Sequence, residues 1–198
     1  MSATPRIILA SGSPARRKLL KELAVPFECH TGNYEEDMGK FKDPKMLSTY
    51  LASEKAKYIA PKFPNSIIIG ADTFGVIDNK LLGKPRTHKE AEQMIAQMSE
   101  NTVFVHTGVA VIKTDKEGKI TRELISHTST KLIFTKLTPQ IIREIIKKDD
   151  VLNIAGALTI EGESGKYVQK IEGDYHNVIG LPLFQLKEML SELGVKTA

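Results

Sequence analysis

The sequence predicts an α/β fold, in which helices flank a mixed, twisted central sheet and the chain forms an active-site cleft. Short apolar runs typical of strands alternate with segments whose apolar residues recur at helical spacing. The chain has 198 residues, of which 41% are hydrophobic and 26% charged, as in an ordinary globular protein. This length forms one or two compact units. We therefore expect a single domain over residues 1–198. The alternative is that this domain consists of two lobes around a cleft.

The N-terminal third is expected to begin with a strand, a turn and a helix. The apolar run 6–10 predicts the strand, and leucines at helical spacing after Pro14 predict the helix, which Ser13 can cap. Backbone N–H groups at such a junction suit an anion. The other elements expected here, in chain order, are a strand at 27–30, a loop at 33–37 and a helix from Asp43-Pro44 to about Pro61.

The rest of the chain is expected to supply most of the sheet. Residues 66–71 form a continuous apolar run, typical of a strand covered on both faces, and deliver Asp72 and Thr73 at its end. The later elements are expected to be a hairpin over 74–82, a helix over 87–98, a long hairpin with strands 103–113 and 120–135 around a turn at 115–118, a helix from Thr138-Pro139, and a last helix through Phe184, Leu186, Met189, Leu190 and Leu193.

Charge, cysteine content and hydropathy narrow the class of protein. The net charge of +4 suits nucleic acid or small anions, but basic residues are interleaved with acids, which argues against a nucleic-acid partner. The single cysteine, Cys29, excludes an intrachain disulfide and a thiolate zinc site. It is interpreted as a small core residue of a strand, with a catalytic thiol as the alternative. With neither a leader-like start nor an apolar window of about 18 residues, we expect a cytoplasmic protein without a membrane partner.

Several residues are suited to binding a metal and a polyphosphate. Carboxylates are the ligands that Mg²⁺ or Mn²⁺ prefers, cations can clamp phosphates, and Ser11-Gly12-Ser13 offers hydroxyl and backbone donors. Together they predict phosphoryl transfer to a metal-activated water. Each has a simpler interpretation as well, namely a solvated acidic loop, ordinary surface charges and a turn cap at Asp72. The carboxylates are Glu35, Glu36, Asp37 and Asp72, and the cations are Arg16, Arg17, Lys55 and Lys84.

Five motifs follow one another in the sequence. The first, Ile8 to Leu20, is a serine-proline-arginine loop entering a helix. The others are Gly70-Ala71-Asp72-Thr73, Leu82-Gly83-Lys84-Pro85, Thr107-Gly108-Val109 and the segment Glu172 to Pro182. In this order they resemble the motifs of the Maf family of nucleoside triphosphate pyrophosphatases, and the resemblance covers residues 6 to 190.

The resemblance implies a hydrolase that cuts the α–β bond of a nucleoside triphosphate to give the monophosphate and pyrophosphate. It implies dependence on Mg²⁺ or Mn²⁺ and a homodimer. Glu35 and Asp72 would hold the metal, and either one could activate water. Lys55 and Lys84 would act with these carboxylates in catalysis by neutralising the phosphates. The residues that would bind the substrate are Ser11, Ser13, Arg16, Thr73 and Glu161.

The sequence departs from the common pattern at two positions that bear on the base. Ala15 stands where the family commonly has an arginine, and Glu161 where it commonly has a glutamine. The resemblance implies that this arginine and glutamine contact the pyrimidine base in the subgroup that acts on dTTP and UTP. With Ala15 before Arg16-Arg17 and Glu161 before Gly162, the pattern resembles more closely the subgroup that acts on 7-methyl-GTP. Chemistry supports this interpretation, because an ionised glutamate can accept from guanine N1–H and its amine, although the amine of cytosine would suit it as well. The alternatives are a dTTP/UTP pyrophosphatase, a non-catalytic nucleotide-binding regulator of cell division, and a phosphatase that releases single phosphates.

Overall fold

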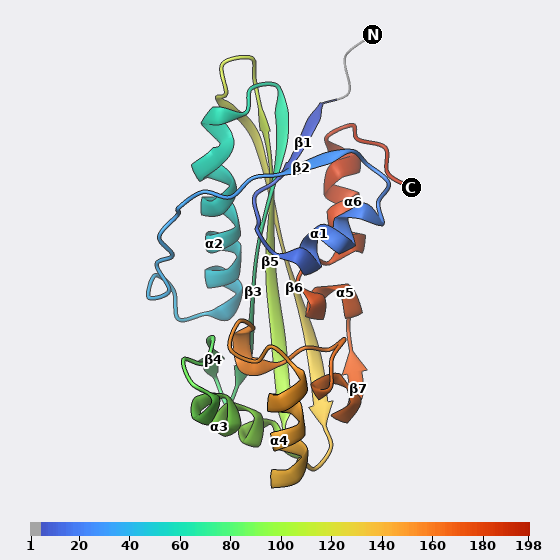
Figure 1. Cartoon of the computed structure of the whole chain (residues 1–198). Coiled ribbons are helices and arrows are strands. Elements are labelled where there is room, and N and C mark those ends of the chain that lie inside the picture. Colours follow the sequence, from blue (N-terminus) through green and yellow to red (C-terminus); the bar gives the residue numbers. More distant parts are fainter. Residues whose placement is uncertain (1–4) are drawn as a thin grey trace. The chain divides into compact units, whose positions relative to one another are not determined.

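The computed structural model describes residues 5–198 as strands and helices in alternation (Figure 1). The elements that carry the sheet and its flanking helices are, in chain order, β1 (Arg6–Leu9), α1 (Pro14–Lys21), β2 (Phe27–Cys29), α2 (Pro44–Ile59), β3 (Ser66–Ile77), β4 (Lys80–Leu82), α3 (His88–Met98), β5 (Thr102–Thr114), β6 (Ile120–Phe134), α4 (Pro139–Lys148), β7 (Val168–Glu172), α5 (Tyr175–Ile179) and α6 (Leu183–Glu192).

The strands form one mixed sheet of seven strands in the order β2-β1-β3-β5-β6-β7, with β4 paired to β3. β1 runs parallel to both neighbours, so that Ile8 lies opposite Glu28 on one side and Ile68 on the other. β4 is antiparallel to β3, and β7 is antiparallel to β6. The predicted α/β class with a mixed central sheet is confirmed.

The chain divides into two compact units. The first comprises the described residues up to Asp72, Thr107–Thr128 and Gly180–Ala198; the second comprises Thr73–His106 and Ser129–Ile179. β3, β5 and β6 each contribute one part to each unit. Each unit has its own buried apolar cluster, centred in the first on Ile8, Ile68 and Ile112 and in the second on Ile95, Leu132 and Phe134.

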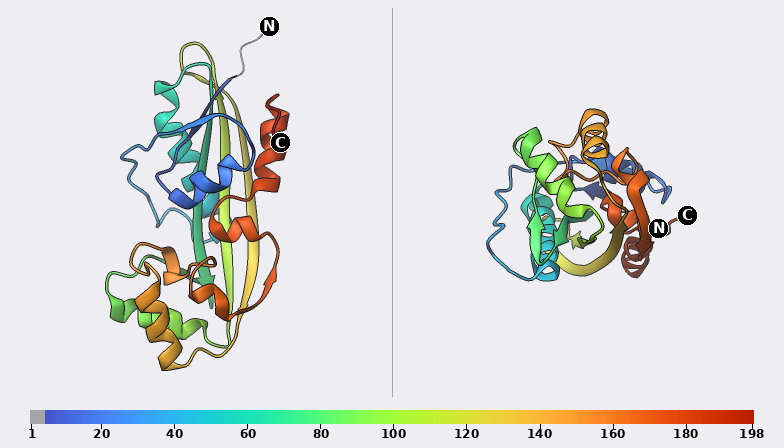
Figure 2. Two further views of the ribbon diagram at one scale, coloured as in Figure 1. Left: turned by 45° about the vertical axis from the view of Figure 1, so that its right-hand side comes forward. Right: turned by 90° about the horizontal axis from the view of Figure 1, so that it is seen from below.

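In the first unit, α2 packs directly on the sheet because two glycines lie beneath it. A Cβ at Gly70 of β3 would be 2.1 Å from the Ala52 carbonyl oxygen, and one at Gly108 of β5 would be 2.3 Å from the Ser48 carbonyl oxygen. Asp43 caps α2 by accepting a hydrogen bond from the Met46 N–H at 3.0 Å. α1 and α6 lie side by side in the same unit (Figures 1 and 2).

In the second unit, α3 and α4 pack against each other. Threonine caps both helices: Thr87 accepts from the Glu90 N–H at 3.1 Å, and Thr138 accepts from the Ile141 N–H at 3.3 Å. The inward faces of these helices bury Ile95 and Ile145 in the apolar cluster. α4 ends at Asp149, whose N–H still bonds to the Ile145 carbonyl oxygen at 2.9 Å.

Two expectations about the chain are corrected. β3 does not end at Asp72 but continues to Ile77, because the Asp72 carboxylate has a cationic partner and can stay buried within a strand. Cys29 is exposed and not a core residue, since the three-residue strand β2 lies at the edge of the sheet. The helix predicted through Phe184 is confirmed as α6, in which the Phe184 side chain is 72% exposed.

Among the described residues, no helix is both long enough and apolar enough to span a membrane. The expectation about a leader also involves residues 1–4, which lie outside the described part of the chain.

Candidate active site

The turn between β1 and α1 is held together by two serine hydroxyls and one arginine. Ser13 Oγ caps α1 by accepting from the Arg16 N–H at 3.4 Å, and Ser11 Oγ accepts from the Ser13 N–H at 3.2 Å. The Arg16 guanidinium donates through Nη1 to Ser11 Oγ at 3.3 Å and through Nε to the Gly180 carbonyl oxygen at 2.8 Å. Arg16 therefore lies folded against its own turn, with its charge at the N-terminus of the helix.

Lys55 of α2 bridges two carboxylates. Its Nζ lies 2.5 Å from Oδ1 of Asp72 and 2.8 Å from Oε1 of Glu36. Only 18% of the Lys55 side chain and 10% of the Asp72 side chain is exposed, whereas Glu36 comes from an exposed loop. The close packing of α2 on Gly70 fixes the Lys55–Asp72 pair, because Gly70 lies two residues before Asp72 in β3. The pair thus joins two regular elements.

Burial governs the electrostatics of these groups. It raises the pKa of the Asp72 carboxyl above its ordinary value, and the charges of Lys55 and Arg16 oppose that rise. Burial also lowers the pKa of the Arg16 guanidinium, against the attraction of Asp72 and Glu36. Charges that have lost part of their hydration interact more strongly than surface charges do. The two cations and two carboxylates therefore form an electrostatically coupled group.

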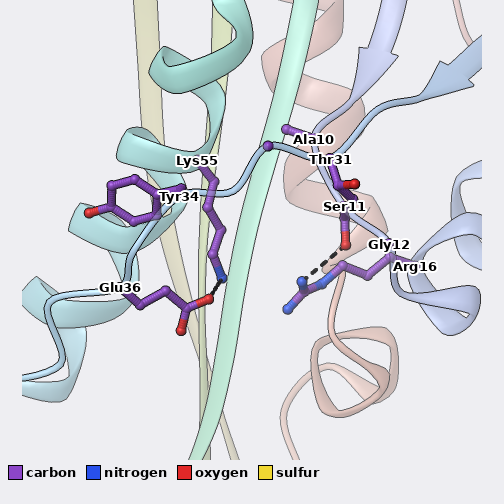
Figure 3. A pocket seen from close by; sticks show the side chains of 9 residues that line it. Ala10, Ser11, Gly12, Arg16, Thr31, Tyr34, Glu36 and Lys55 are labelled. Atoms are coloured by element: carbon purple, nitrogen blue, oxygen red, sulfur yellow. Dashed lines mark hydrogen bonds and ion pairs between the residues drawn. The ribbon is translucent and has the colours of Figure 1, made fainter.

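A cavity of about 190 Å³ opens beside Arg16, Lys55 and Glu36 (Figure 3). Figure 3 shows Lys55 and Glu36 on one side of it and Arg16 and Ser11 on the other. The loop after β2 forms part of the wall and crosses closely over α2, because a Cβ at Gly32 would be 2.2 Å from Cδ1 of Tyr58. The residues that line the cavity are Ala10, Ser11, Gly12, Arg16, Thr31, Gly32, Tyr34, Glu36 and Lys55.

The structure brings together, within the first unit, five of the residues expected from the sequence: Ser11, Ser13, Arg16, Lys55 and Asp72. Glu35, also in the first unit, is exposed and is not among the residues that line the cavity. The other three belong to the second unit: Thr73 is half-buried in β3, while Lys84 and Glu161 are exposed in loops.

Glu36, which contacts Lys55, is the residue of this site that sequence reasoning did not single out. Glu35, Glu36 and Asp37 are consecutive acids in a segment without regular structure, so no periodicity indicates which of them faces α2. A resemblance to known motifs selected Glu35, whereas the contact with Lys55 is made by its neighbour. Only the path of the loop distinguishes the two.

Asp72 and Glu36 fit a divalent cation as a partial ligand set. One ammonium contacts both carboxylates, so both already face a shared cationic group. Within residues 5–198, no group of three or more His, Cys, Asp or Glu side chains is arranged to hold a metal ion. Magnesium sites in phosphoryl-transfer enzymes commonly use one or two carboxylates, with water and substrate phosphates completing the shell.

Comparison with known proteins agrees with this arrangement of elements. The family model described as Maf-like protein matches residues 6–193. A relative named dTTP/UTP pyrophosphatase from Symbiobacterium thermophilum is 35% identical, covering 96% of this chain and 94% of its own. One of the same name from Bacillus cereus is 36% identical, covering 96% of each chain.

The fold also has a counterpart among solved structures. A HAM1 protein from Coxiella burnetii matches with a TM-score of 0.53 at 15% identity, covering 96% of this chain and 100% of the other. At that identity the likeness concerns the fold alone. The family match, in contrast, spans nearly the whole sequence and includes both the Ser11–Arg16 turn and Asp72. This chain is a member of the Maf-like protein family.

Proposed function

We propose that this chain is a nucleoside triphosphate pyrophosphatase. The observation that carries the proposal is that Arg16, Lys55 and Glu36 line one cavity at the N-terminus of α1, where Lys55 also contacts the buried Asp72. Cations and N–H groups suit the phosphates, and the carboxylates suit a metal and a water. The names of the relatives, dTTP/UTP pyrophosphatase, point to the same reaction.

The reaction adds water across the α–β anhydride bond. Water oxygen bonds to the α phosphorus, the bond from that phosphorus to the bridging oxygen breaks, and pyrophosphate leaves with both bonding electrons. The proton released from the water passes to a carboxylate. Asp72 is suited to take it because burial has already raised its pKa. Lys55 and Arg16 neutralise the charge that develops on the phosphate oxygens.

The metal in this proposal is Mg²⁺ or Mn²⁺, held by Asp72 and by a carboxylate of the loop after β2. When bound, it would draw charge from the phosphate oxygens and lower the pKa of a coordinated water. The contact of Glu36 with Lys55 supports Glu36 in this role, and the sequence resemblance favours its neighbour Glu35. Glu35→Gln and Glu36→Gln, compared by Mn²⁺ binding, distinguish the two.

Two classes of base are favoured by different observations. The relatives are named for dTTP and UTP, which favours a pyrimidine substrate. Ala15 and Glu161 favour 7-methyl-GTP, because a carboxylate accepts from guanine N1–H and its amine but opposes the O4 carbonyl of uracil. Glu161 is exposed, so this discrimination requires that the bound base itself exclude water from the carboxylate.

The predicted contacts of Thr73, Lys84 and Glu161 with substrate belong to the same proposal, as does the predicted homodimer. Lys84→Ala should lower turnover if Lys84 neutralises phosphate charge, and sedimentation at several concentrations tests the dimer. A non-catalytic regulator of cell division and a phosphatase that releases single phosphates are the competing functions.

Product analysis after incubation with Mg²⁺ and 7-methyl-GTP, GTP, CTP, UTP or dTTP tests the proposal. Monophosphate with pyrophosphate supports it. Diphosphate with orthophosphate would identify a phosphatase, and failure to turn over any of these nucleotides, with Mg²⁺ or with Mn²⁺ in its place, would favour the binding protein. The order of kcat/KM across the nucleotides shows which base is preferred. If Glu161 contacts the base, Glu161→Gln should shift that preference towards UTP and dTTP.

A further inference from the structure

In the second unit, the loop 159–166 is fastened to the end of α4 by one carboxylate. Asp149, the residue at which α4 ends, accepts through Oδ1 from the Glu163 N–H at 2.8 Å and through Oδ2 from the Ser164 N–H at 3.0 Å. Its Oδ2 also lies 2.9 Å from the hydroxyl of Ser164. Three donors therefore converge on one side chain, and two of them are backbone groups of the loop.

Ser164 extends this attachment across the loop. Its hydroxyl oxygen accepts from the Thr159 N–H at 3.0 Å, and its one proton has two acceptors at 2.9 Å, namely Oδ2 of Asp149 and the Thr159 carbonyl oxygen. A hydrogen bond from the Gly162 N–H to the Thr159 carbonyl oxygen, 3.0 Å long, closes the turn between them. The two ends of the segment 159–164 are thus held together, and both are connected to Asp149.

Ion pairs add a second attachment to the same helix end. Oε2 of Glu163 lies 3.2 Å from Nζ of Lys148 on α4 and 2.7 Å from Nζ of Lys166 in the loop. The hydrogen bond from Lys166, and to a smaller extent that from Lys148, lowers the pKa of the Glu163 carboxyl. The Glu163 side chain is only 9% exposed, so it faces α4 and not solvent.

The loop passes so close to Asp149 that a side chain would not fit at its nearest point. A Cβ at Gly162 would be 2.5 Å from Oδ1 of Asp149, and one at Gly165 would be 1.9 Å from the carbonyl oxygen of Ile160. Glu161 lies between these fixed points and is exposed. The contacts of Asp149 therefore determine where the Glu161 side chain leaves the backbone.

We propose that Asp149 is a positioning residue for base selectivity, which acts by fixing the loop that presents Glu161. The inference rests on the proposed function, in which Glu161 contacts the base. Asp149 itself touches no substrate. Its role is to hold the Glu161 backbone in one place, so that the carboxylate discriminates between bases by position and not only by charge.

The decisive variant is Asp149→Asn. Asparagine keeps the size of the side chain but replaces one acceptor with an NH₂ group, which then faces an N–H donor of the loop. We expect kcat/KM for the preferred nucleotide to fall about tenfold, mainly through KM, while that for the least preferred nucleotide changes less than about twofold. The selectivity ratio should shrink accordingly, and kcat should stay within about threefold of wild type.

Asp150→Asn is the matched control. Asp150 is the next residue and is exposed, and it accepts only from the side-chain amide of Asn153, at 3.0 and 2.9 Å, among the side-chain contacts described. This variant removes an equal charge at nearly the same place without touching the loop 159–166. It should leave the selectivity ratio unchanged.

A double-mutant comparison separates positioning from general loss of structure. In a Glu161→Ala background, Asp149→Asn should not change the selectivity ratio further, because there is no carboxylate left to misplace. An unchanged ratio in Asp149→Asn alone, or an equal drop in both backgrounds, would overturn the inference. If Asp149→Asn does not fold, Ser164→Ala removes the hydroxyl while keeping both backbone bonds, and a smaller shift in the same direction is expected.

The outcomes also separate this inference from the proposed function. Absence of pyrophosphate release by the wild-type protein with every nucleotide would reject the proposed function. If wild type and Asp149→Asn both release pyrophosphate, with the same order of substrates and the same ratio of kcat/KM values, only the role of Asp149 would be rejected.

Discussion

The charged pocket of the first unit and the loop 159–166 of the second fix their functional groups in different ways. In the pocket, side chains on α2 and β3 contact each other directly, and Lys55 and Asp72 are held by the packing of the helix on Gly70. In the loop, a single carboxylate holds backbone N–H groups of a segment that contains no strand or α-helix and only the start of a short 3-10 helix, Ser164–Tyr167. Packing in the core fixes the positions of side chains on helices and strands, whereas a loop needs specific polar contacts to hold it in place. The pocket should therefore respond to mutation mainly in rate, and the loop mainly in selectivity.

Asp72→Asn should give the largest effect in this comparison. It keeps the size of the buried side chain but removes the charge that pairs with Lys55 and the oxygen that would bind metal. We expect kcat to fall on the order of a hundredfold or more for every nucleotide, with the substrate order unchanged. Steady-state kinetics checks this, with circular dichroism to confirm folding. Activity near that of wild type would remove Asp72 from the mechanism.

Lys55→Met should separate catalysis from metal binding. The ammonium occupies the place between Asp72 and Glu36 where a metal would bind, so its removal leaves two carboxylates without their cation. We expect kcat to fall by about tenfold or more, while Mn²⁺ in the absence of nucleotide binds about tenfold more tightly. Electron paramagnetic resonance titration of free Mn²⁺ measures the affinity. Weaker binding in the variant would show that the carboxylates do not share a metal.

Gly70→Ala should test whether the packing of α2 positions the pocket. The added methyl group meets the Ala52 carbonyl oxygen at 2.1 Å, so the helix must shift at a cost of about 1 to 3 kcal/mol in the free energy of unfolding. Turnover should fall together with stability, because Lys55 moves with the helix. Gly83→Ala is the control, since nothing lies within 4 Å of its Cβ. Urea unfolding and kinetics on both variants provide the measurement, and a stable, fully active Gly70→Ala would refute the link.

The smallest expected effect concerns Glu28 on the exposed edge strand β2. Hydrogen bonds from Arg6 and then from His30 lower the pKa of Glu28 from 4.5 to about 2. Because the folded pKa is depressed, this contribution to stability is fully present above pH about 4.5 and is lost as the pH falls towards about 2. The stability difference between wild type and Glu28→Gln, measured by urea unfolding, should narrow over that window. A constant difference from pH 5 to pH 2 would contradict the depressed pKa.

The order and type of the elements follow from the sequence because local signals agree there. Ser13, Asp43, Thr87 and Thr138 cap the four helices expected after them, and apolar runs mark the strands. The boundary at Asp72 was misplaced for a physical reason. A charged residue normally marks the end of a buried strand, but Lys55 lies 17 positions away in the sequence and is brought into contact only by folding.

The sequence by itself determined the fold class, the family and most of the charged residues that gather in the first unit, since helical and strand periodicity and ordered motifs are local properties. Only the tertiary structure decided that Glu36 contacts Lys55, that Cys29 lies at an exposed edge and that Asp149 holds the loop of Glu161. These facts depend on the path of segments without periodicity and on contacts between residues distant in the chain. No local pattern specifies such contacts, because they arise when helices and strands pack and the remaining polar groups find partners.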